Sequence, residues 1–369
     1  MVERAPSWAD TGVFTQSRDH GSTEDMVEVV NRPVPYKGAT VTYAQTHRWE
    51  GVQALIGGLR RFAPDVLYLN SYWSLPYSQA VMVLRRVGVF GRVGVVIAPR
   101  GEFAPEALAH HGTRKRVLRA ANRIAGTHDG VTWHASSERE AQDIRDYIGA
   151  DAPILVREND SLLPTTADPA PVRPDGATGL RAVFVGRLLE HKGAALAIQA
   201  VAQAGPGVTL DVFGPEEDAD YVAECRRLAE AAGGRVRFGG TLGSDDVRPT
   251  LRQYDVLVMP TRSENFGHVI AEALSAGVPV IVPDVTPWTA RIRTYGAGDV
   301  VERTAEAFRD AVSARAASGR DGVAAARAAA GRAYDAWQQE VAALPHLFDL
   351  LRDRRMLGTS ADQPAGTPV

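Results

Sequence analysis

The stretch SENFGHVIAEALSAGVPVIVPD, residues 263–284, predicts a short loop, a helix that begins near Gly267, and a buried strand after Gly277. Apolar residues at helical spacing indicate the helix, and the short run of Val, Ile and Pro indicates the strand. Glu264 precedes the helix, while Glu272 falls at the edge of its apolar face. A carboxylate at that edge can reach a ligand lying over the start of the helix.

The start of this helix is a candidate anion-binding site. Its first backbone amides have no partner within the helix, and the helix dipole favours a diphosphate or polarised sugar hydroxyls there. Carboxylates accept hydrogen bonds from vicinal hydroxyls, so one acid could bind a hexose and the other a ribose. A solvated loop acid and an ordinary exposed helix acid are the alternatives. The candidate positions are Glu264, Asn265, Phe266, Gly267, His268 and Glu272.

A second motif, VFVGRLLEHKG at residues 183–193, predicts a strand that ends at Gly186 and a helix that begins near Gly193. Arg187 and Lys192 lie between them, where two cations could neutralise a diphosphate leaving group. Two ordinary surface cations are the alternative. The spacing matches neither the P-loop pattern nor the dinucleotide G-x-G-x-x-G, which disfavours nucleotide hydrolases and simple NAD enzymes.

The length of 369 residues favours two domains, because one hydrophobic core seldom serves so long a chain. Helical patterns alternate with Val/Ile/Leu-rich runs in both halves, which indicates α/β domains with parallel sheets. A proline-rich stretch separates them. The expected parts are an N-terminal acceptor-side domain 1–163, a linker 164–179, a C-terminal nucleotide-sugar-binding domain 180–330, a helix 331–357 docking across both domains, and a disordered tail 358–369.

The bulk composition excludes several classes of protein. A net charge of -3 gives no overall attraction to nucleic acid. Cys225 is the only cysteine, so neither an intramolecular disulfide nor a cysteine-based zinc site is possible. No apolar run approaches the roughly 20 residues of a membrane span, and the first residues lack the apolar core of a signal peptide. We therefore expect a cytoplasmic protein, with peripheral contact at the inner face of the membrane as a possibility.

Four ordered motifs together resemble the retaining GT-B transferases of glycosyltransferase family 4. They are GRLLEHKG, FGPEED, ENFGHVIAEALSAGVPVI with its E-x7-E spacing, and the TPW that follows at residues 286–288. In the N-terminal half, PDVLYLNSYWS, APRGEFAPEAL and WHASSEREAQDI resemble the bacterial cell-surface polysaccharide branch of that group. The likeness covers nearly all of the chain after about Val13. It implies two Rossmann-like domains facing across a cleft.

The resemblance also implies an activity, a hexosyl transfer with retention from a UDP- or GDP-sugar to a glycan or polyprenyl-linked acceptor in cell-surface polysaccharide or glycoconjugate synthesis. Glu264 would contact the donor sugar and Glu272 the ribose, while Arg187 and Lys192 would bind the diphosphate. Gly186 belongs to the same motif. No metal or cofactor would be needed, because cations and a helix dipole replace the Mg²⁺ used elsewhere.

Two departures from the family pattern stand in the N-terminal half. Many relatives carry His-Gly where this chain has Arg100 and Gly101, and Arg100 could bind an acceptor's phosphate or carboxylate or make a structural salt bridge. With Ser71, these two residues are the acceptor-side candidates. Relatives also begin with a strand, a Gly-rich loop and a helix that residues 1–12 are too few to supply. We therefore expect the first strand, central in such a sheet, to be missing.

Residues 114–123 contain five cations and no acid. Helical projection groups Arg116, Arg119 and Arg123 opposite four apolar positions: Val117, Leu118, Ala121 and Ile124. Such a basic amphipathic helix could rest on anionic lipid, whereas a solvated helix face is the plain alternative.

Two other functions remain open from the sequence. An N-terminally truncated or degenerate nucleotide-sugar-binding protein without transferase activity would account for the short N-terminus. A GT-B epimerase or phosphorylase is disfavoured, because no pyridoxal-binding lysine can be placed and an epimerase needs no acceptor surface. Fold alone does not decide among these functions, so the assignment depends on the site motifs.

Overall fold

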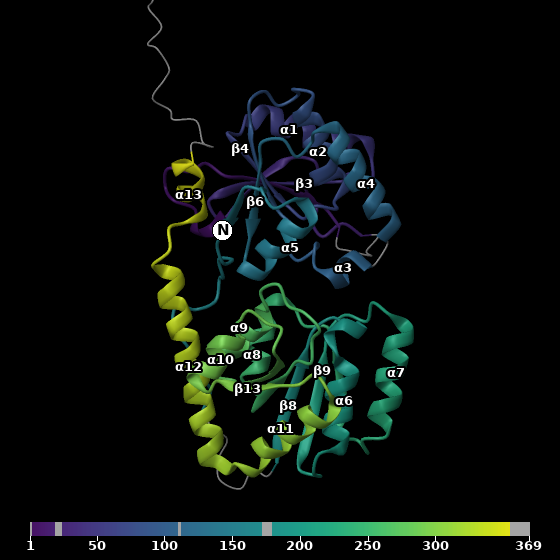
Figure 1. Ribbon diagram of the computed structural model, residues 1–369, viewed down its shortest axis with the longest axis vertical. Coiled ribbons are helices and arrows are strands. Elements are labelled where there is room, and N and C mark those ends of the chain that lie inside the picture. The colour runs from purple at the N-terminus through teal and green to yellow at the C-terminus, as the bar shows by residue number, and fades with distance from the viewer. Residues whose placement is uncertain (1, 19–23, 110–111, 172–178, 355–369) are drawn as a thin grey trace, which may run out of the picture. The chain divides into compact units, whose positions relative to one another are not determined.

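The computed structural model describes residues 2–18, 24–109, 112–171 and 179–354 (Figure 1). The chain divides into two compact units. Unit 1 comprises Met1–Ser161 together with Pro345–Val369, and unit 2 comprises Leu162–Leu344. The C-terminal segment therefore returns to the unit in which the chain begins.

Unit 2 contains a parallel sheet of six strands in the order β10-β9-β8-β11-β12-β13. Because the chain reverses direction across the sheet between β8 and β11, this is a doubly wound Rossmann-like arrangement. The strands are β8 (Leu180–Val185), β9 (Val208–Phe213), β10 (Val236–Gly240), β11 (Val256–Val258), β12 (Val280–Pro283) and β13 (Gly298–Val301).

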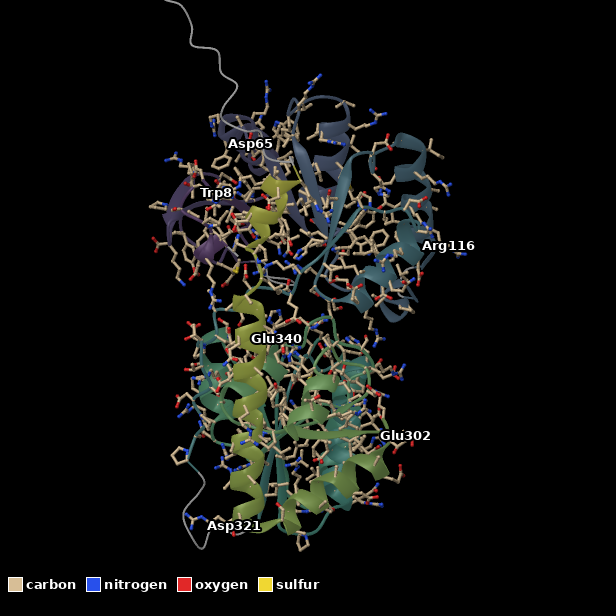
Figure 2. All side chains as sticks on the ribbon, turned by 60° about the vertical axis from the view of Figure 1, so that its left-hand side comes forward. Trp8, Asp65, Arg116, Glu302, Asp321 and Glu340 are labelled. Carbon is tan, nitrogen blue, oxygen red and sulfur yellow. The ribbon has the colours of Figure 1, made fainter. Side chains whose placement is uncertain are left out.

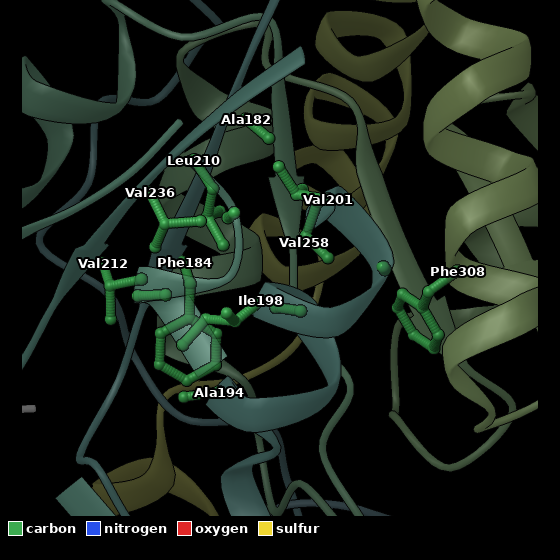
Figure 3. Close-up of a cluster of buried hydrophobic side chains, with 14 of the residues drawn as sticks. Ala182, Phe184, Ala194, Ile198, Val201, Leu210, Val212, Val236, Val258 and Phe308 are labelled. Carbon is green, nitrogen blue, oxygen red and sulfur yellow. The ribbon is translucent and has the colours of Figure 1, made fainter. Parts of the chain in front are cut away.

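Helices cover both faces of this sheet, which explains why its strands are continuous apolar runs. One core lies under α6, α7 and α11, where Phe184, Ile198 and Phe308 are fully buried (Figure 3). A second core lies under α8, α9, α10 and α12. The helices are α6 (Ala194–Gln203), α7 (Ala219–Glu230), α8 (Ser244–Leu251), α9 (His268–Ser275), α10 (Thr289–Tyr295), α11 (Ala305–Ala317) and α12 (Gly319–Ala342).

Unit 1 contains two sheets that no described strand pairing joins. The first has the order β1-β3-β2, with β2 antiparallel to β3, and the second is the parallel sheet β4-β5-β6-β7. Both contribute to one core, in which Ala44 of β3 lies with Leu67 of β4. The strands are β1 (Gly12–Gln16), β2 (Pro33–Tyr36), β3 (Ala39–Ala44), β4 (Val66–Asn70), β5 (Gly94–Ala98), β6 (Val131–Ala135) and β7 (Ile154–Val156).

The helices of unit 1 complete its α/β layers. In the core, Tyr72, Phe103, Trp133 and Tyr147 form a cluster of aromatic rings with centroids 4.3–6.3 Å apart. The helical segments are η1 (Val2–Arg4), α1 (Trp49–Phe62), η2 (Leu75–Gln79), α2 (Ala80–Arg86), α3 (Pro105–Ala109), α4 (Gly112–Ala125), α5 (Glu138–Ile148) and α13 (Leu347–Asp353).

The C-terminal segment differs from the single helix expected over residues 331–357. α12 belongs to unit 2 and ends at Ala342, whereas α13 is a separate helix in unit 1. His346 caps α13 by accepting from the amide of Phe348 at 3.1 Å, so a new helix begins there rather than one helix continuing. The expected tail 358–369 lies outside the described residues.

The described part of the expected linker, 164–171, is fastened to unit 2. The amide of Ala167 donates to Asp335, and the hydroxyl of Tyr334 donates to the carbonyl of Pro164 at 2.6 Å. The amide of Asp168 donates to the carbonyl of Ser275. The prolines therefore mark an extended segment that packs against α9 and α12, rather than a free spacer.

Candidate functional site

Two loops emerge side by side at the carboxyl edge of the sheet in unit 2. β8 and β11 are adjacent and parallel, with Ala182 opposite Val256, so the loop 186–193 and the loop 259–267 leave the sheet at the same edge. These are the two motifs singled out in the sequence. In open α/β sheets, ligands bind at this edge where the strand order reverses.

The two loops meet in an ion pair. Nζ of Lys192 lies 2.6 Å from Oε1 of Glu264, and the side chains are only 17% and 9% exposed. A charge-assisted bond this short holds both side chains in one orientation. The structure thus brings together two of the three residues for which the sequence predicts a catalytic role, from positions 72 residues apart.

Backbone contacts hold the two loops in register. The amide of Arg262 donates to the carbonyl of His191 at 2.7 Å, and the guanidinium of Arg262 pairs with Glu190. Gly193 has φ +83°, and a Cβ at that position would lie 2.2 Å from the carbonyl oxygen of Pro260. Only glycine permits this approach without displacing the backbone that carries the acid.

Arg303, which the sequence reasoning missed, spans both loops. Its Nε donates to the carbonyl of Pro260 at 2.8 Å and its Nη2 to the carbonyl of Glu190 at 3.4 Å. Burial and then the charge of Arg262 lower the pKa of Arg303. The residue follows β13 in sequence, so no local motif links it to the site. It is a positioning residue, since its described bonds go to backbone carbonyls.

The start of α9 is fixed by an aromatic cluster. Gly267 has φ +77° as the N-cap residue, and the preceding Phe266 is buried with its carbonyl accepting from Nε1 of Trp288 at 2.7 Å. The rings of Phe266, Trp288 and Trp337 lie 5.0–5.8 Å apart. The TPW motif therefore has a local task, which is to anchor the loop that carries Glu264. The ring of His268 packs on Phe266 at 4.8 Å.

Glu272 is the most perturbed acid of this edge. Burial raises its pKa to about 7, and its carboxylate has no hydrogen-bond or ion-pair partner among the described side chains. Uncompensated burial of an acid costs stability, which is typical of groups kept for a ligand. The expected position at the edge of the apolar face agrees with its partial exposure.

Arg187 lies apart from the buried pair. Its guanidinium is 52% exposed and sits 3.3 Å from Glu217 of the FGPEED segment. Gly186, just before it, continues the sheet through a bond from its amide to the carbonyl of Phe213. No group of three or more His, Cys, Asp or Glu side chains among the described residues is placed to hold a metal ion.

The acceptor-side candidates lie together at the carboxyl edge of the sheet β4-β5-β6-β7 in unit 1. The hydroxyl of Ser71 donates to Glu102 at 2.6 Å, and the amide of Gly101 donates to Glu140 at 2.7 Å. These two residues therefore brace the loops. Arg100 has only neutral oxygen partners in the described structure, so it makes no salt bridge there.

The architecture of unit 1 and unit 2 is that of the GT-B fold. Sucrose-phosphate synthase from Thermosynechococcus elongatus is similar with a TM-score of 0.70 and 16% identity, covering 93% of this chain and 89% of that one. HepE from Anabaena, solved in complex with UDP and glucose, is similar with a TM-score of 0.61 and 20% identity, covering 83% and 85%. At these identities the likeness shows the fold.

Residues 176–318, most of unit 2, match the family model of the group 1 glycosyl transferases. The lipopolysaccharide core biosynthesis glycosyltransferase LpsE of Rhizobium meliloti is 34% identical over 49% of this chain and 50% of its own length. The 2-deoxystreptamine glucosyltransferase of Streptomyces kanamyceticus is 31% identical over 60% of each. The matched part of the chain thus spans about half the length of these relatives.

Proposed function

We propose that the protein transfers a hexosyl unit from a nucleotide-diphosphate sugar to a glycan or lipid-linked acceptor. The observation that carries this proposal is the Lys192–Glu264 pair at the carboxyl edge of the sheet, beside the start of α9. A cation and an acid held 2.6 Å apart can bind the phosphate and the sugar on either side of the bond that breaks. The family match of residues 176–318 supports the same chemistry.

Each candidate residue binds a different part of the donor in this proposal. Lys192 neutralises the diphosphate, together with Arg187 once Arg187 has left its partner Glu217. Glu264 accepts hydrogen bonds from hydroxyls of the hexose. The start of α9 serves the same anion, because the N-terminal end of a helix favours negative charge. Glu272, half-buried and without a described partner, accepts hydrogen bonds from the ribose hydroxyls. UDP or GDP is the proposed carrier, and the UDP complex of HepE supports a uridine nucleotide.

Retention and independence of metal ions belong to the same proposal. In this proposal Arg187 and Lys192 neutralise the leaving diphosphate in place of a Mg²⁺, and no cofactor takes part. Retention follows if the acceptor attacks from the face of the departing phosphate, which then takes the acceptor's proton. The name of LpsE, a lipopolysaccharide core biosynthesis glycosyltransferase, supports a role of this transfer in cell-surface polysaccharide or glycoconjugate synthesis.

A thermal-shift screen of the whole protein with UDP-, GDP-, ADP- and dTDP-sugars tests the donor site. A ligand at a hundredfold excess over its dissociation constant adds about 2.7 kcal/mol, which raises Tm by roughly 5–10 °C in units of this size. We expect such a shift with one nucleotide class, and release of the free nucleotide when an acceptor is supplied.

The outcomes separate an enzyme from a binding protein. A shift without any turnover, even into water over long incubation, would favour a nucleotide-sugar-binding protein. The absence of a shift with all four classes would overturn the donor site itself.

We further propose that α4 contacts an anionic membrane. Two of the apolar positions of this helix, Val117 and Ile124, are 65% and 88% exposed. The inward side is polar instead, since Asn122 is buried in bonds to Tyr72 and Gln79, each 2.8 Å. Arg119 lies 4.5 Å over the ring of Tyr147.

The outer face of α4 therefore mixes apolar and basic side chains. Arg116, labelled in Figure 2, and Arg123 are exposed on the same helix as Val117 and Ile124. Exposed apolar side chains flanked by arginines suit the boundary between headgroups and acyl chains. No helix in the described ranges is long and apolar enough to cross a bilayer.

Liposome flotation tests this contact. We expect the double variant Arg116→Glu/Arg123→Glu to bind vesicles of phosphatidylglycerol and phosphatidylcholine at least about tenfold more weakly, since each surface cation adds about 1 kcal/mol. Val117→Ser/Ile124→Ser should weaken binding by a similar factor. Arg60→Glu/Arg61→Glu on exposed positions of α1 is the matched control. Equal flotation of the α4 variants and the wild type would refute the membrane contact.

A further inference from the structure

Arg100 occupies a backbone conformation that arginine rarely adopts. It follows β5 with φ +57°, and Ser71, which follows the neighbouring strand β4, has φ +85°. Two non-glycine residues with positive φ at adjacent strand ends are energetically costly. Such strain persists where the surrounding structure dictates a side-chain position, and it concentrates at ligand sites.

The guanidinium of Arg100 is held by three neutral oxygens. Nε donates to Asn70 at 2.7 Å, Nη2 donates to the hydroxyl of Tyr68 at 3.0 Å, and Nη1 donates to Asn159. Because a guanidinium has five N–H groups, one on Nη1 and one on Nη2 have no acceptor in the described structure. The guanidinium is thus held on three sides by neutral groups, with no ion pair in the described structure.

A chain of hydrogen bonds fixes this orientation. Arg100 can only donate, so the hydroxyl of Tyr68 accepts from it and must donate its own proton to Nδ1 of His134, 2.6 Å away. His134 then carries its proton on Nε2 and donates it to the carbonyl of Arg157 at 2.8 Å. Burial lowers the pKa of His134 to about 4, so the ring stays neutral as this order of donors requires.

The neighbouring acids bond to other groups. The carboxylate of Glu102 accepts from the amides of Tyr72 and Trp73 as well as from Ser71. Burial raises the pKa of Glu102.

A second acid, Glu140, accepts from the amide of Gly101 and from both the amide and the hydroxyl of Ser136. A third, Asp160, lies 2.8 Å from Arg157. An arginine so placed among satisfied acids has its remaining donors available for an anion from outside.

We infer that Arg100 is the specificity-determining residue of the acceptor side and binds an oxyanion of the acceptor through the free N–H groups of Nη1 and Nη2. A phosphate or a carboxylate matches two such donors equally well. The acceptor is therefore an anionic glycan or phosphate-linked saccharide rather than a neutral sugar. This inference rests on the proposed transferase only where it calls the bound anion an acceptor. The anion site itself is built from residues of unit 1 alone.

Saturation-transfer NMR on the whole protein tests the site with three probes, α-glucose 1-phosphate, glucuronate and methyl α-glucoside. The two anionic probes separate phosphate from carboxylate as the source of the charge. We expect at least one of them to bind about tenfold or more tightly than the neutral glucoside, the gain of a bidentate charge-assisted contact. Arg100→Asn should abolish the difference, since asparagine tolerates positive φ and leaves the fold intact.

Two controls decide where the anion sits. Arg61→Asn removes an exposed cation of unit 1 and should change nothing, and Lys192→Ala should leave the Arg100-dependent binding in place. If the anions bind no better than the glucoside, or if their binding survives Arg100→Asn, the inference is wrong. Donor binding is read separately by the nucleotide-sugar screen, so either result can fail without the other.

Discussion

Lys192→Ala is expected to lower the rate at which the protein releases nucleoside diphosphate from its donor by about 10²–10³, the usual loss when one preorganised charge at a developing anion is removed. Lys192 pairs with Glu264 in the free protein. In the proposed reaction, negative charge grows on the diphosphate as the glycosidic bond breaks, and the largely buried ammonium of Lys192 neutralises it. Binding of the free nucleoside diphosphate should weaken less than turnover does.

The measurement is single-turnover release of nucleoside diphosphate from the donor identified by thermal shift, with binding measured by calorimetry. Lys37→Ala is the matched control, because Lys37 also lies 2.9 Å from a glutamate, Glu3, in an exposed pair of unit 1. A melting curve checks folding, since the change leaves the buried Glu264 without its partner. Turnover within a few-fold of the wild type in a folded Lys192→Ala protein would remove Lys192 from the catalytic assignment.

Glu272→Gln is expected to make the free protein more stable at pH 8 while it weakens binding of the donor. The folded-state pKa of about 7 lies above the ordinary 4.5, because burial disfavours the carboxylate. Below pH 4.5 the acid is protonated in both states and costs nothing. As pH rises from 4.5 to 7 the free energy of unfolding falls, and above pH 7 the loss stays constant.

The substitution should therefore raise the free energy of unfolding by about 1–3 kcal/mol at pH 8 and by much less at pH 5. In Tm this is roughly 3–8 °C at pH 8. Affinity for the donor should fall about tenfold, because an amide replaces a charged acceptor of the ribose hydroxyls. Glu224→Gln, an exposed acid on α7, is the control. A Glu272→Gln protein destabilised at pH 8 with unchanged donor affinity would contradict the assignment.

The sequence predicted the elements of the donor edge closely. The helix expected to begin near Gly267 is α9 from His268, and the strand expected to end at Gly186 is β8. Local signals carry such predictions, because a buried strand, a glycine with positive φ and a helix start each have their own residue preferences. The family match of residues 176–318 and the GT-B architecture agree with the α/β reading of the chain.

The sequence predicted contacts between distant residues less well. Helical projection of residues 114–123 grouped Val117 and Ile124 opposite the arginines, but it did not predict that Asn122 marks the side that is buried in unit 1. A buried amide needs hydrogen-bond partners, and those of Asn122 are Tyr72 and Gln79, which lie far away in the sequence.

By itself, the sequence determined the order of strands and helices at the donor edge and singled out Lys192, Glu264 and Glu272 as donor-site candidates. Only the tertiary structure decided that Lys192 and Glu264 form a pair, that Arg303 braces their loops and that Arg100 keeps two donors free. The reason is physical. Local preferences act over a few residues, whereas partners and burial depend on which strand ends the parallel pairing brings to one edge of a sheet.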